Sequence, residues 1–64
     1  MQERQTAILN LIKYRAINLG FNEDMRLVGE AIAIRAFHAG ASAHRAVTEG
    51  LLASDRLARI SHED

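Results

Sequence analysis

Two glycines, Gly20 and Gly40, divide this chain of 64 residues into three segments of helix-forming composition. The chain has no proline, and 11 of its residues are alanine, the strongest helix former. A glycine that adopts the left-handed conformation directly after a helix ends it. We therefore expect an all-α fold, a small three-helix bundle in a single domain over residues 1–64. The predicted helices span about residues 3–19, 23–39 and 43–60.

The residues beside the glycines support these boundaries. If Gly20 is left-handed, Phe21 follows it and can pack back on Ala16, as in a Schellman motif. Asn22 and Ser42 are suitable N-caps, since their side-chain oxygens can accept a hydrogen bond from the free amides of the next helix.

The second helix carries apolar residues on two sides. At 100° per residue, Met25, Val28 and Ile32 share one side, whereas Leu27, Ile34 and Phe37 lie towards the opposite one. A helix that is apolar nearly all round is buried on both sides. The first and third helices can cover only part of it.

A partner subunit is the remaining way to cover that helix. A chain this short buries only about 60% of its unfolded surface. It has no cysteine for disulfides or thiolate zinc sites, the common remedies in small domains. We therefore predict a homo-oligomer, a dimer in the simplest case, that associates through Val28, Ile32, Ile34 and Phe37.

Small residues recur at helical spacing in the second and third helices. Gly29, Ala33, Ala36 and Gly40 form one stripe, and Ala43, Ala46, Gly50 and Ala53 form another. Glycine inside a helix costs about 1 kcal/mol relative to alanine, so Gly29 and Gly50 require a reason. Close approach of two helix axes is one reason, and simple tolerance of glycine is the alternative. We predict that the second and third helices form a closely packed antiparallel hairpin.

The same hairpin offers a second interpretation. Ala36, the turn Gly40-Ala41-Ser42 and Arg45-Ala46 resemble the helix-turn-helix core of many bacterial repressors. The resemblance covers about 20 residues, and Arg35 and Glu49 depart from it. It implies a dimeric DNA-binding transcriptional regulator with His44, Arg45 and Thr48 facing the major groove. Eight basic residues balance eight acidic ones, however, whereas domains that bind nucleic acid normally carry a basic excess.

No pattern in the chain indicates an enzyme. The three histidines lack metal-ligand spacing, and no serine or threonine has a nearby base in the sequence. We expect no metal, no cofactor and no catalysis. The N-terminus lacks a signal-peptide pattern, and no apolar run approaches the roughly 20 residues of a membrane span. These features predict a cytoplasmic protein that does not bind a membrane.

The favoured function is a small regulatory or inhibitory protein-interaction module that acts as a homo-oligomer. Arg15, Arg45 and Leu52 are the predicted partner-binding residues, because each projects from an exposed or rim position. Arginine and large apolar groups also carry much of the energy of protein interfaces.

Overall fold

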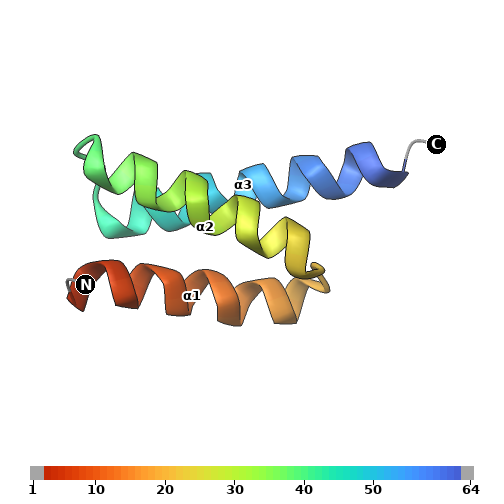
Figure 1. Cartoon of the computed structure of the whole chain (residues 1–64), viewed down its shortest axis with the longest axis horizontal. Helices are drawn as coiled ribbons and strands as arrows, with labels where there is room; N and C mark the ends of the chain where they lie inside the picture. The colour runs from red at the N-terminus through yellow and green to blue at the C-terminus, as the bar shows by residue number, and fades with distance from the viewer. Residues whose placement is uncertain (1–2, 63–64) are drawn as a thin grey trace.

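The computed structural model describes residues 3–62, which form three α-helices. Helix α1 spans Glu3–Leu19, α2 spans Glu23–His38 and α3 spans Ala43–His62. These bounds agree with the predicted ones to within two residues. Figure 1 shows α2 and α3 side by side as a hairpin, with α1 running along it and α3 extending beyond the other two helices. The predicted all-α, three-helix fold is confirmed.

Both predicted glycine stops end a helix as Schellman motifs. Gly20 has φ +77° and Gly40 has φ +107°, both in the left-handed region that favours glycine. The amide of Phe21 donates to the Ala16 carbonyl at 2.9 Å, and the amide of Ala41 repeats this contact to Ala36 at 3.0 Å. The chain therefore reverses direction twice within short turns.

Side-chain caps begin the two following helices. The Asn22 Oδ1 atom accepts a hydrogen bond from the Met25 amide at 2.9 Å, and the Ser42 Oγ atom accepts one from the Arg45 amide at 3.1 Å. Each oxygen satisfies an amide that has no partner within its own helix. Both predicted N-caps are confirmed.

Helices α2 and α3 pack more closely than any other pair, as the small-residue stripes predict. A Cβ atom built on Gly50 would lie 2.5 Å from the Gly29 carbonyl oxygen and 3.0 Å from the Ala33 Cβ atom. The fully buried Ser54 donates a hydrogen bond from its hydroxyl to the Met25 carbonyl across the pair, at 2.6 Å. Since only hydrogen fits between the backbones at these points, glycine is required at positions 29 and 50.

Helix α1 completes the core through large side chains. Ile8, Ile12 and Ala16 are buried, and they lie one turn apart on the same face of α1. The Ile12 Cδ1 atom would lie 3.0 Å from a Cβ atom on Gly50, so all three helices meet at this level. Ala33, Ala46 and Val47 belong to the same core as Ile8 and Ile12.

Two large apolar residues near helix ends are exposed. Ile60 is 67% exposed because it lies on the end of α3 that extends past α1 and α2. Leu19, at the end of α1, is 59% exposed beside an open groove. Helical spacing fixes the direction of a side chain but not the length of the neighbouring helix that would cover it.

Candidate protein-interaction site

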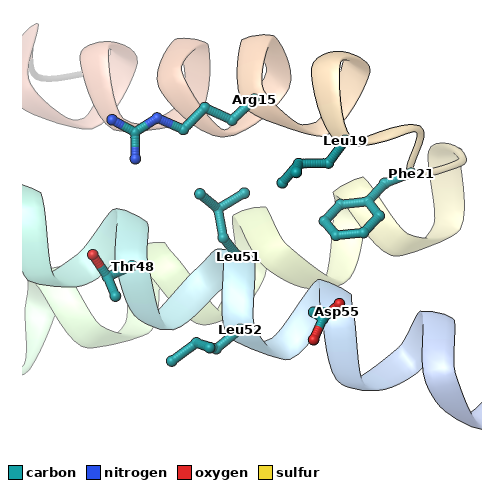
Figure 2. Close-up of a pocket in the computed structure, with 7 residues that line it drawn as sticks. All are labelled: Arg15, Leu19, Phe21, Thr48, Leu51, Leu52 and Asp55. Carbon is teal, nitrogen blue, oxygen red and sulfur yellow. The ribbon is translucent and has the colours of Figure 1, made fainter.

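A groove of about 430 Å³ separates the C-terminal half of α1 from α3. Arg15 and Leu19 come from α1, and Phe21 comes from the turn that follows. Figure 2 shows Leu51 pointing from α3 toward α1, with Leu19 and Phe21 on the facing wall. The α3 wall is formed by Thr48, Leu51, Leu52 and Asp55.

The unequal packing of the three helix pairs explains why the groove is open. The small residues of α2 and α3 draw these two helices together, whereas α1 packs more on α2 than on α3. Leu51 is therefore only partly buried, and Leu19 and Leu52 are 59% and 55% exposed. A surface that leaves several large apolar side chains in water is typical of an interaction site.

The groove carries one positive and one negative side chain on opposite walls. Arg15 on α1 forms no ion pair with any other residue in the range 3–62. Asp55 on α3 accepts a hydrogen bond from the Arg59 Nε atom of the same helix at 3.0 Å. Such an exposed pair contributes roughly 0.3–0.5 kcal/mol, so Asp55 can still interact with another cation.

Leu52 lies on a ridge between this groove and a second hollow. The second hollow, of about 410 Å³, is lined by Ile32, Glu49, Leu52, Ala53 and Arg56. Leu52 borders both, so its side chain projects from the outward face of α3. Two of the predicted partner-binding residues, Arg15 and Leu52, thus line one groove.

Arg45, the third predicted partner-binding residue, lies elsewhere. It borders a hollow beside the turn between α2 and α3, and its Nε atom contacts the Glu49 Oε1 atom at 3.3 Å. The structure therefore does not bring Arg45 together with Arg15 and Leu52 in one site.

The predicted DNA-contacting residues are all exposed on the first turns of α3. His44, Arg45 and Thr48 face solvent, and the Thr48 hydroxyl donates to the His44 carbonyl at 3.0 Å. The helices of a helix-turn-helix cross at about 90–120° and diverge from their turn. Here α2 and α3 stay in contact from the turn to the hydrogen bond between Met25 and Ser54. This geometry does not favour the helix-turn-helix interpretation.

The predicted self-association residues occupy different environments on α2. Val28 is 39% exposed, and Ile32 is partly buried at the second hollow. Ile34 and Phe37 are also partly buried, and they pack against the core. Val28 and its neighbour Leu27 therefore present the most accessible apolar surface of α2.

The sequence analysis missed Leu19, Phe21, Leu51 and Asp55 as residues of the groove. Part of the signal was available, because Thr48, Leu51, Leu52 and Asp55 follow helical spacing and share one face of α3. Nothing in the spacing indicates that α1 stands away from that face.

Within residues 3–62, no three histidine, cysteine, aspartate or glutamate side chains lie together as metal ligands would. None of the helices described over this range combines the length and apolar character needed to cross a membrane. No protein-family model, curated protein or solved structure matches the chain.

Proposed function

We propose that this protein is a small non-enzymatic interaction module that acts as a homo-oligomer and regulates a partner protein. The observation that carries the proposal is the open apolar groove between α1 and α3, with Leu19 and Leu52 more than half exposed. Fully burying a leucine side chain contributes about 1.5–3 kcal/mol, so exposing several of them leaves a large gain available on association.

The small core supports the same proposal. A core of this size has no disulfide to stabilise it, because the sequence contains no cysteine. Large apolar side chains also lie outside the groove, on α2 at Leu27 and Val28, and these give a regulated partner a second surface.

Sedimentation equilibrium at micromolar concentration tests the oligomer. We expect a mass that rises with concentration to at least twice the 7.1 kDa of one chain. A constant mass of 7.1 kDa up to millimolar concentration would show that the protein does not self-associate.

Binding of a partner protein is tested with a matched pair of variants. Immobilised Leu52→Glu and Ile17→Glu chains each place one carboxylate at an exposed leucine or isoleucine, but only position 52 borders the groove. We expect the native and Ile17→Glu chains to capture a partner protein. The Leu52→Glu chain should not capture it. Equal capture by both variants would show that partner binding does not depend on the groove.

The alternative function, DNA binding by a helix-turn-helix, makes a different prediction. Binding through His44, Arg45 and Thr48 would weaken steeply with salt, because the phosphate backbone dominates such affinity. The antiparallel α2–α3 contact gives this alternative no support, and we do not propose it.

A further inference from the structure

We infer that the groove between α1 and α3 is the surface on which a second copy of this chain docks, in a two-fold symmetric dimer that pairs Arg15 of each copy with Asp55 of the other. The inference rests on the proposed homo-oligomer and places its interface on α1 and α3, not on the α2 residues predicted from the sequence, which are Val28, Ile32, Ile34 and Phe37. It would bring α1 and α3 of both copies together as four packed helices.

The two walls of the groove carry opposite charges, so the groove of one copy is complementary to the groove of another. Arg15 stands on the α1 wall and Asp55 on the α3 wall. In a two-fold interface, if one residue contacts a second, the second also contacts the first across the axis. One rotation therefore forms the pair between Arg15 and Asp55 twice. The formal net charge of zero also leaves no overall repulsion between copies.

The shape of α3 agrees with this pairing. Leu52 forms a ridge directly beside the groove, since it borders both the groove and the hollow near Ile32. A surface with a ridge next to a groove can pack on its own two-fold copy, each ridge entering the opposite groove.

A copy of this chain satisfies the groove better than a ligand of one charge. An acidic peptide would pair with Arg15 and meet Asp55 as a like charge, and a basic peptide would do the reverse. A second copy presents both charges in the required order. It also buries Leu19 and Leu52 together with the two ion pairs.

Charge reversal on one wall at a time tests the inference. Arg15→Asp and Asp55→Arg should each raise the dimer Kd by at least about tenfold, because two attractive contacts become two repulsive ones. An equimolar mixture of the two variants should recover the native affinity to within about threefold, since both contacts between unlike variants are attractive again. Lys13→Asp, which reverses an exposed charge of α1 outside the groove, is the matched control and should leave the Kd unchanged.

Sedimentation of each variant and of the mixture, with circular dichroism to verify folding, separates the outcomes. If both single variants dimerise with the native Kd, or if the mixture fails to recover the native Kd, the two-fold groove interface is overturned. The homo-oligomer would then form through another surface. A native chain that is monomeric throughout would overturn the proposed oligomer itself, together with this interface.

Discussion

Replacing Gly50 by alanine sets two effects of opposite sign against each other. Alanine in a helix interior is more favourable than glycine by about 1 kcal/mol, so an unhindered Gly50→Ala change would stabilise α3. At this position the new Cβ atom would lie 2.5 Å from the Gly29 carbonyl oxygen and 3.0 Å from both Ala33 Cβ and Ile12 Cδ1. The nearest of these atoms belongs to the backbone, so rotation of a side chain cannot relieve the contact.

The helices must therefore move apart. Overpacking of a well-packed core costs typically about 1–3 kcal/mol, and separation also weakens the hydrogen bond from Ser54 to Met25, worth about 1 kcal/mol. After the propensity gain is subtracted, we expect Gly50→Ala to lower the free energy of unfolding by about 1–2 kcal/mol. Gly50→Leu should lower it further, because it adds three more carbon atoms to the same contact.

Thermal unfolding followed by circular dichroism, at one fixed protein concentration, measures the effect. For a domain of this size, 1 kcal/mol corresponds to roughly 4–8 °C in Tm, so Gly50→Ala should lower Tm by about 5–15 °C. Ala31→Gly, at an exposed position in the middle of α2, is the control that measures helix propensity alone. If Gly50→Ala instead raises Tm by about as much as Ala31→Gly lowers it, the close approach of α2 and α3 at Gly50 does not exist.

Four further substitutions test individual structural features by the same measurement. Ser54→Ala removes the buried hydroxyl that bonds to Met25 and should cost about 1 kcal/mol, whereas an unchanged Tm would show that this bond adds no net stability. Asn22→Ala removes the N-cap of α2 and should also cost about 1 kcal/mol, with Asn22→Ser retaining most of the native stability as the control. Gly20→Ala and Gly40→Ala each give a residue with a Cβ atom a left-handed conformation and should each cost about 1–2 kcal/mol. This cost comes from the backbone conformation, because no neighbouring atom lies within 4 Å of either Cβ. A stabilising effect of either substitution would contradict the Schellman geometry.

The helix boundaries of this protein could be predicted from the sequence alone. Helix boundaries depend on interactions between residues a few positions apart, such as the hydrogen bond from Phe21 to Ala16 or the one from Met25 to Asn22. The stripe containing Gly50 also indicated a close helix contact, because glycine within a helix is unfavourable unless close packing compensates for it.

Which helix faces remain open could not be predicted from the sequence, because it depends on how the three helices pack. Arg15 and Leu52 are exposed by their helical positions, but their meeting with Leu19 and Asp55 at one groove depends on where α1 comes to rest against the hairpin. That placement follows from the tight fit of α2 on α3 and from the bulk of Ile8 and Ile12 beneath α1. The periodicity of one helix gives the direction of each side chain, whereas the distance between two helices depends on the side chains of both.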